Sequence, residues 1–213
     1  MTFKARHVMS KGLISVEPTT PFREIVSTLQ EHGISGVPVI APQGTLVGIV
    51  TEADLMLKEQ GTPGLRVHPL SLTLDHPSEE LTRKAAGAVA RDLMTSPVLT
   101  ADEDTTLREI ARAMSLNRIK RVVITSHDEP VGMVTRADVL KVYLRPDEEI
   151  RAEIVDTILP TGFGVVQVTV NDGVVALNGC VYRRSLAEFL ARCVERVEGV
   201  VHVRNQVSHE SED

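Results

Sequence analysis

Two short motifs of one type carry the polar residues best suited to binding a phosphorylated ligand. They are Gly48-Ile-Val-Thr-Glu-Ala-Asp54 and Gly132-Met-Val-Thr-Arg-Ala-Asp138. In each, an apolar strand is expected to lead into a helix that begins at the threonine. The first N–H groups of such a helix and the threonine hydroxyl converge where an anion such as phosphate is favoured. The motifs therefore predict four ligand contacts, which are Thr51, Asp54, Thr135 and Asp138.

Both motifs also have a purely structural interpretation as helix-capping boxes. A threonine caps the helix, and the acid three residues later bonds back to it. For one isolated copy this interpretation is favoured. Two copies in duplicated segments favour ligand contact, and the roles are compatible because a capped helix start is itself an anion site.

Basic residues are concentrated around the second motif. They are Arg118, Lys120, Arg121 and Arg136, whereas the corresponding positions around the first motif hold Gly33, Ser35, Gly36 and Glu52. A solvated basic face and a phosphate clamp both remain open as interpretations. If they form a clamp, the second motif binds a phosphorylated ligand better, because Glu52 would oppose an anion beside the first.

The segments around the motifs are copies of each other. Adding 85 to the numbers of Met9, Leu29 and Ile34 leads to Met94, Met114 and Ile119, and after a one-residue deletion the offset becomes 84. A register kept over about fifty residues indicates tandem duplication.

Each copy is expected to run strand, helix, strand, strand, helix. In the first copy these elements are predicted at residues 13–16, from Pro21 onward, at 33–40, at 46–50 and at 52–58. Residues 61–77 are predicted to form a linker. Ser78-Glu-Glu-Leu81 resembles a helix N-cap, and residues 84–93 are expected to continue that helix into the second copy.

The pattern changes after residue 146. A helix is predicted at 148–159 with Ile150, Ile154, Val155 and Ile158 inward, followed by strands at 165–170 and 174–181 joined by the hairpin signal Asn171-Asp-Gly173. A second helix is predicted at 184–198, ended by Gly199. Its inward residues are Leu186, Phe189, Leu190, Cys193 and Val197. A strand at 200–207 and a frayed polar tail at 208–213 complete the chain.

The duplicated segments resemble a pair of CBS (cystathionine-beta-synthase) domains, the arrangement called a Bateman module. The resemblance rests on residues 8–10, 36–40, 48–54, 93–97 and 132–138. It implies a regulatory protein that binds an adenosine nucleotide in the cleft between the repeats. In this family the motif threonine contacts phosphate, the aspartate contacts ribose hydroxyls, and backbone near the middle strand holds the base. The implied contacts are Thr51, Asp54, Thr135 and Asp138, with Ile34 and Ile119 near the base.

The second repeat departs from the family pattern. Val123 stands where the first repeat has Pro38, and the turn at 126–129 lacks the glycine of Gln43-Gly44. We therefore expect unequal pockets, the better one including Thr135, Arg136 and Asp138 together with Arg118, Ile119 and Lys120.

The CBS resemblance also implies a homodimer, because CBS pairs join through their helical faces into a flat disc. The apolar surface is expected from helices that bear Phe22, Ile25 and Leu29, or Leu107, Ile110 and Met114. Residues 147–207 resemble a BON domain, with Gly173, Gly179 and Gly199 in fitting places. That resemblance implies contact with a phospholipid surface, a protein or another ligand.

Composition limits the other classes of function. A net charge of −6 and a pI near 5.7 argue against a nucleic-acid binder. No apolar run approaches the ~20 residues of a membrane helix, so a cytoplasmic protein is expected. Cys180 and Cys193 lack metal-ligand spacing and are expected to be reduced, and the seven histidines show no paired spacing for a metal site. No catalytic motif is present, and an enzyme is not expected.

The predicted fold is α/β (α+β), with two βαββα repeats as a pseudo-twofold pair and a small αββαβ domain. The predicted boundaries are 1–62 and 87–145 for the repeats, 63–86 for the linker, 146–208 for the last domain and 209–213 for a disordered tail. The predicted function is non-catalytic regulation, in which AMP, ADP or ATP binds as a regulatory ligand, no cofactor is required, and the BON domain responds. The alternative is a constitutive protein or membrane-surface scaffold without a nucleotide ligand.

Overall fold

The computed structural model describes residues 2–59, 79–159 and 165–211. Its internal contacts divide the chain into two compact units. We call residues 10–103 and 122–133 the N-terminal unit, and residues 1–9, 104–121 and 134–213 the C-terminal unit. The linker predicted at 61–77 and the N-cap residue Ser78 lie outside the described residues.

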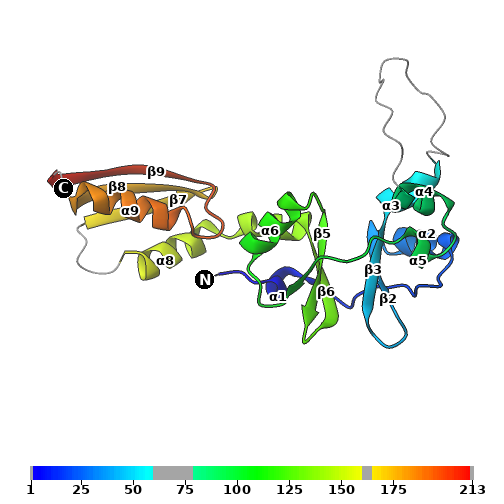
Figure 1. Cartoon of the computed structure of the whole chain (residues 1–213). Coiled ribbons are helices and arrows are strands. Elements are labelled where there is room, and N and C mark those ends of the chain that lie inside the picture. The colour runs from blue at the N-terminus through cyan, green and yellow to red at the C-terminus, as the bar shows by residue number, and fades with distance from the viewer. Residues whose placement is uncertain (1, 60–78, 160–164, 212–213) are drawn as a thin grey trace, which may run out of the picture. The chain divides into compact units, whose positions relative to one another are not determined.

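The N-terminal unit contains two sheets and four helices among its described residues (Figure 1). β2 (Gly36–Ile40) and β3 (Leu46–Thr51) form an antiparallel pair. A four-stranded sheet has the order β1-β6-β5-β4, in which β4 is parallel to β5. Its strands are β1 (Ser10–Lys11), β4 (Thr100–Asp102), β5 (Arg121–Ser126) and β6 (Glu129–Thr135). The helices are α2 (Phe22–Glu31), α3 (Glu52–Glu59), α4 (Glu79–Ala86) and α5 (Ala90–Leu93).

An aliphatic core explains how the first repeat holds together with few aromatic residues. Ile25 and Leu29, one turn apart on α2, are buried against Val37 and Val39 of β2 and Val50 of β3. The helical spacing of the first pair and the alternation along β3 bring these side chains to one side of their elements. The wholly apolar β2 is buried along most of its length.

The C-terminal unit joins the helices of the second repeat to the last domain. Its first part holds α1 (Ala5–Val8), α6 (Leu107–Leu116), α7 (Arg136–Leu140) and the 3-10 helix η1 (Lys141–Leu144). The last domain follows as α8 (Asp147–Thr157), β7 (Val165–Asn171), β8 (Val174–Arg183), α9 (Arg184–Val194) and β9 (His202–Ser211).

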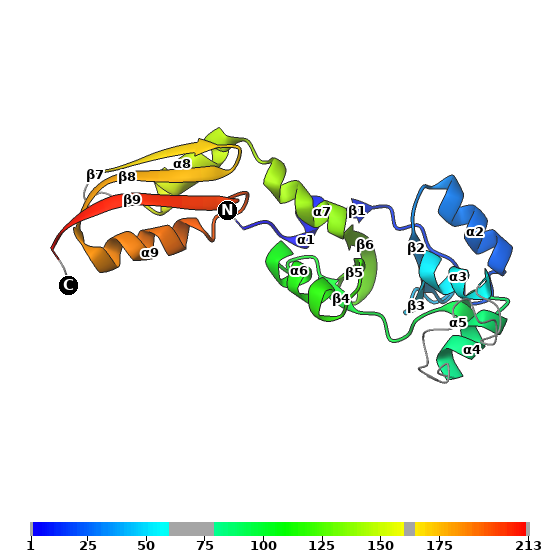
Figure 2. The same cartoon turned by 90° about the horizontal axis from the view of Figure 1, so that it is seen from above.

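The last domain is a three-stranded sheet of order β7-β8-β9 packed with two helices (Figure 2). The predicted hairpin is confirmed, since β7 and β8 are antiparallel and Asp172 and Gly173 both have positive φ. β9 runs parallel to β8. Ile150 and Ile154 of α8 share a core with Val175 and Leu177 of β8.

In each repeat, the start of the first long helix bonds to the segment that precedes the other repeat. The N–H of Phe22 bonds to the carbonyl of Ala88, and the N–H of Leu107 bonds to the carbonyl of Phe3. Likewise, Ala90 bonds to Thr20 and Ala5 bonds to Thr105. Every pair follows the offset of 85, so the tandem duplication is preserved in the backbone hydrogen bonds.

Two predictions for the repeats were wrong. No strand covers residues 13–16, where only Val16 forms a bridge, to Val39. The helix predicted at 84–93 is broken between α4 and α5. Val89 is extended there and bridges Pro21, because the backbone of this stretch pairs with the start of α2 instead of continuing the helix.

The last domain also corrects the sequence interpretation. The helix predicted at 184–198 ends at Val194, and Phe189 and Val155, both predicted inward, are exposed. The tail predicted to fray from residue 208 is strand up to Ser211. Pairing of its backbone with β8 explains this, since Ser208 lies opposite Cys180 and Ser211 lies opposite Arg183.

Candidate functional site

The first motif forms a closed hydrogen-bond ring at the junction of β3 and α3. The carboxylate oxygen Oδ2 of Asp54 accepts the backbone N–H of Thr51 at 2.9 Å and its hydroxyl at 2.7 Å. These are bonds of the capping type, so the structural interpretation of the motif is correct in geometry. The side chain of Asp54 is nevertheless buried, and its other oxygen needs a partner.

That partner is Lys84, a residue that sequence reasoning placed in the linker. The Nζ of Lys84 lies 2.5 Å from Oδ1 of Asp54 and 2.7 Å from the hydroxyl of Thr95. The side chains of Lys84 and Asp54 are only 5% and 10% exposed. No sequence signal identified Lys84 as a partner of Asp54, because the two residues lie 30 positions apart in the chain.

The second motif repeats the ring with a different cation. Oδ2 of Asp138 accepts the backbone N–H of Thr135 at 2.8 Å and its hydroxyl at 2.6 Å. Oδ1 accepts Lys141 at 2.7 Å, but the lysine side chain is 58% exposed. Burial raises the pKa of Asp138, and the hydrogen bonds from Lys141 and Thr135 together outweigh it, so the pKa lies below its ordinary value.

The basic segment predicted near the second motif does lie beside it. The backbone N–H of Arg136 bonds to the carbonyl of Lys120 at 3.1 Å, and its side-chain Nε bonds to the carbonyl of Ile119 at 3.2 Å. Arg118, Lys120 and Arg136 are exposed, and Ile119 is half-buried. In the first repeat the equivalent bond runs from the backbone N–H of Glu52 to the carbonyl of Ser35. An acidic and a neutral residue therefore occupy the positions that Arg136 and Lys120 hold in the second repeat.

The candidates for the base pocket differ little between the repeats. Ile34 and Ile119 are both half-buried, and each donates its backbone N–H to the helix before it, at Leu29 and Met114 respectively. Each residue therefore sits directly after a helix and before the strand that pairs with the motif.

Family comparison explains this duplicated arrangement. A sequence profile described as "CBS domain" matches residues 5–60 and 90–145, and one described as "BON domain" matches residues 146–210. The chain belongs to the CBS-domain family. Two CBS repeats followed by a BON domain give the α/β fold expected from the sequence.

Individual relatives cover the CBS pair. An uncharacterized protein of Methanopyrus kandleri is 30% identical over 138 residues, which cover 63% of this chain and 60% of that protein. The chloroplastic CBS domain-containing protein CBSX1 of Arabidopsis thaliana is 30% identical over 138 residues, covering 61% and 58%. The chain thus spans less than two thirds of either relative. The crystal structure of CBSX2 in complex with AMP matches with a TM-score of 0.55 and 27% identity, over 67% of this chain and 97% of that one.

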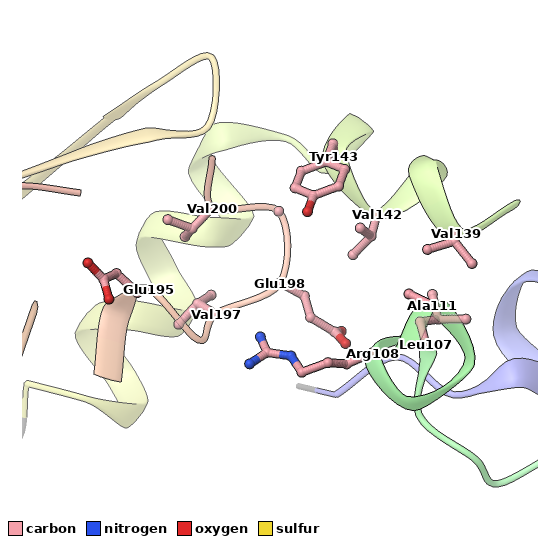
Figure 3. Close-up of a pocket in the computed structure, with 11 residues that line it drawn as sticks. Leu107, Arg108, Ala111, Val139, Val142, Tyr143, Glu195, Val197, Glu198 and Val200 are labelled. Carbon is pink, nitrogen blue, oxygen red and sulfur yellow. The ribbon is translucent and has the colours of Figure 1, made fainter. Parts of the chain in front are cut away.

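A small cavity lies where η1 and α6 meet the turn after α9 in the C-terminal unit (Figure 3). Its volume is about 180 Å³, and its wall is mainly apolar. Figure 3 shows Tyr143 and Val142 on one side, facing Val197, Val200 and the charged side chains of Glu198 and Arg108. Sequence reasoning did not anticipate this junction between the second CBS repeat and the BON domain.

Arg145 is the central residue of the junction. Its Nη1 donates to the carbonyl of Glu198 at 2.6 Å, and its Nη2 pairs with Glu153 at 2.9 Å. The guanidinium also lies 5.6 Å from the ring centre of Phe3. Gly199, with φ +92°, allows close packing, because an added Cβ would come within 2.9 Å of Ile150 Cδ1.

The apolar surface of the repeats is not where it was predicted. Ile25, Leu29, Leu107, Ile110 and Met114 are all core residues. Their helical spacing reflects packing inside the monomer, so that part of the dimer argument was wrong. Large apolar side chains are exposed instead at Leu116, 73%, and Leu140, 60%, on α6 and α7.

Other features of the described residues bear on function. None of their helices has the length and apolar character needed to cross a membrane. Cys180 and Cys193 are free, half-buried thiols. No group of three or more potential metal ligands gathers among the residues described.

Proposed function

We propose that this protein is a non-catalytic regulator whose CBS pair binds an adenosine nucleotide, and whose BON domain responds to that ligand. The observation that carries the proposal is the duplicated Thr-Asp ring, which fixes an aspartate beside a threonine in each repeat. The similarity of the CBS pair to CBSX2, whose crystal structure contains AMP, supports an adenosine ligand.

The site at Thr135 and Asp138 is the better candidate for binding. Phosphate needs cations, and the exposed side chains of Arg136, Lys120 and Arg118 belong to segments joined by backbone bonds at this motif. Lys141 must leave Oδ1 of Asp138 if a ribose hydroxyl is to replace it. Water can solvate Lys141 once it leaves, because its side chain is 58% exposed, and the incoming hydroxyl keeps Oδ1 of the buried Asp138 hydrogen-bonded.

A short path leads from this site to the BON domain. Lys141 is the first residue of η1, and Val142 and Tyr143 of the same turn line the junction cavity. Arg145 follows and bonds to Glu198 and Glu153 of the BON domain. In the proposed mechanism, release of Lys141 by a nucleotide shifts η1 and changes the contacts of Arg145.

The proposal includes a homodimer formed through CBS helices. Leu140, Val139 and Arg136 of α7 line a surface groove with Ala111, Met114 and Ser115 of α6. Leu140 of α7 and Leu116 of α6 expose apolar area that association would bury.

Calorimetric titration with AMP, ADP and ATP tests the function most directly. We expect saturable binding of at least one of them, and Asp138→Ala should weaken it at least tenfold. Glu149→Ala, an exposed acid on α8, is the matched control and should bind like the wild type. If the folded wild type binds none of the three at millimolar concentration, the proposal is wrong and the scaffold alternative gains support.

A further inference from the structure

The carboxylate of Asp54 has no oxygen left without a donor. Oδ2 receives the N–H and the hydroxyl of Thr51, and Oδ1 receives Lys84 at 2.5 Å and the hydroxyl of Thr95 at 3.3 Å. Lys84 in turn donates to Thr95. The aspartate, the lysine and the two threonines are thus joined by hydrogen bonds within the N-terminal unit.

The two repeats differ in how deeply the lysine that pairs with the motif aspartate is buried. Residues Asp54 and Asp138 are equally enclosed, at 7% and 6% exposure. The side chain of Lys84 is 5% exposed, whereas that of Lys141 is 58% exposed. Lys141 can exchange its carboxylate for water, whereas Lys84 is enclosed together with the carboxylate that it binds. Departure of Lys84 would therefore take an enclosed ammonium from an enclosed carboxylate, whereas Lys141 is solvated as it leaves Asp138.

The helix that carries Lys84 is also held in place. Figure 1 shows α4 beside α3, the helix that begins at the first motif, and the two are in contact. Lys58 of α3 donates its Nζ to the carbonyl of Gly87 at 2.7 Å, directly after α4. α4 is thus bonded to the first motif through Lys84 and Asp54, and the residue directly after α4 is bonded to Lys58 near the end of α3.

We propose that Lys84 is a built-in occupant of the first CBS site, holding the oxygen of Asp54 that a ribose hydroxyl would otherwise use. This inference rests on the proposed function, and it sets the stoichiometry and the regulation of that function. The chain binds one nucleotide, at the Thr135–Asp138 site. With Lys84 present, the first site opens when α4 is displaced, so whatever binds α4 controls a second nucleotide.

Calorimetry with AMP, or with whichever of ADP and ATP binds, measures the number of ligands per chain. The wild type should bind one, and Lys84→Met should bind two, because the neutral side chain frees Oδ1 of Asp54. Lys58→Met is the matched control, since it removes a tether of α4 without uncovering Asp54, and it should still bind one. Circular dichroism establishes that each variant is folded.

Hydrogen–deuterium exchange of the wild type gives a second readout that needs no variant. Saturating nucleotide should slow exchange in residues 135–140 and leave residues 51–55 and 79–86 unchanged. Two ligands per wild-type chain, or faster exchange in 79–86 on binding, would overturn the inference while leaving the proposed function intact. A folded Lys84→Met variant that still binds one ligand would overturn it equally. Absence of binding by the wild type would instead overturn the proposed function, and this inference with it.

Discussion

Arg145 donates a 2.6 Å hydrogen bond to the backbone carbonyl of Glu198, joining the end of the second CBS repeat to the turn that follows α9. The same guanidinium pairs with Glu153, and both side chains are largely buried, at 9% and 15% exposure. One residue therefore connects the segment after η1 with two separate parts of the BON domain. This arrangement makes Arg145 the first residue to test for coupling.

Replacing Arg145 should weaken the junction strongly. Arg145→Ala removes the largely buried ion pair with Glu153 and the hydrogen bond to the backbone carbonyl of Glu198, and breaking a buried pair in this way costs about 3–5 kcal/mol. Urea denaturation monitored by circular dichroism measures the change. Arg151→Ala, which removes an exposed pair with Glu148, is the control and should cost much less. Equal losses in the two variants would contradict a special role for Arg145.

The response of the BON domain to nucleotide should also depend on Arg145. In the wild type, saturating nucleotide should change the amide exchange of residues 195–200, because these residues meet η1 and Arg145. In Arg145→Ala the nucleotide should still bind, but that change should disappear. An unchanged response in the variant would show that the signal reaches the BON domain by a route that does not include Arg145.

Stability should depend on pH in two separate windows. Burial raises the pKa of Glu198 above its ordinary 4.5, against the smaller effects of the Phe3 N–H, Arg145 and Arg108. The pKa of Glu198 is higher in the folded protein than in the unfolded chain. Its contribution to the free energy of unfolding is therefore fully present below pH 4.5 and is lost as the pH rises through the folded pKa. Glu198→Gln should remove this loss, so wild type and variant should diverge as the pH rises above 4.5.

Asp138 should act in the opposite direction. Burial raises its pKa, but the bonds from Lys141 and Thr135 leave it below 3.8, so its contribution is present above pH 3.8 and lost as the pH falls through the folded pKa. Asp138→Asn should abolish that acid-side loss. Urea titrations between pH 3 and 7 measure both windows, and a wild type whose stability follows both variants throughout would refute the two assignments.

The local geometry of the site could be predicted from the sequence, but its long-range partners could not. A threonine and an aspartate three residues apart set their own hydrogen bonds, so the ring at Thr51 and Asp54 was accessible to pattern reasoning. Lys84 reaches Asp54 from 30 residues away, and Arg145 reaches Glu198 from 53 residues away. Neither contact leaves a periodic signal. The end of β9 was missed for a related reason, because its polar residues pair through the backbone and bury little apolar area.

Association should depend on the exposed leucines of the second repeat. We expect light scattering to give the mass of a dimer at micromolar concentration. Leu116→Lys combined with Leu140→Lys should shift the protein toward a monomer, because two charges would replace exposed apolar area on α6 and α7. Tyr182→Lys, an equally exposed position in the BON domain, should leave the mass unchanged. A wild type with the mass of one chain would rule out the dimer.

The BON domain should fold when separated from the CBS pair. Its core of Ile154, Val168, Val175, Leu177 and Leu190 comes entirely from residues after Arg145. Phe189, also predicted for this core, is exposed and contributes little. The Arg145 bonds to Glu153 and Glu198 also lie within a fragment of residues 145–213.

Such a fragment loses its contacts with Phe3 and Val142, so its stability should be marginal, as expected of a domain of ~60 residues. We expect dispersed amide resonances and a cooperative urea transition at lower urea than in the full chain. Arg145→Ala within the fragment measures what the Arg145 bonds to Glu153 and Glu198 contribute to stability, because the contacts with Phe3 and Val142 are already absent from the fragment. A collapsed spectrum for the unaltered fragment would show that the BON core needs the CBS junction to fold.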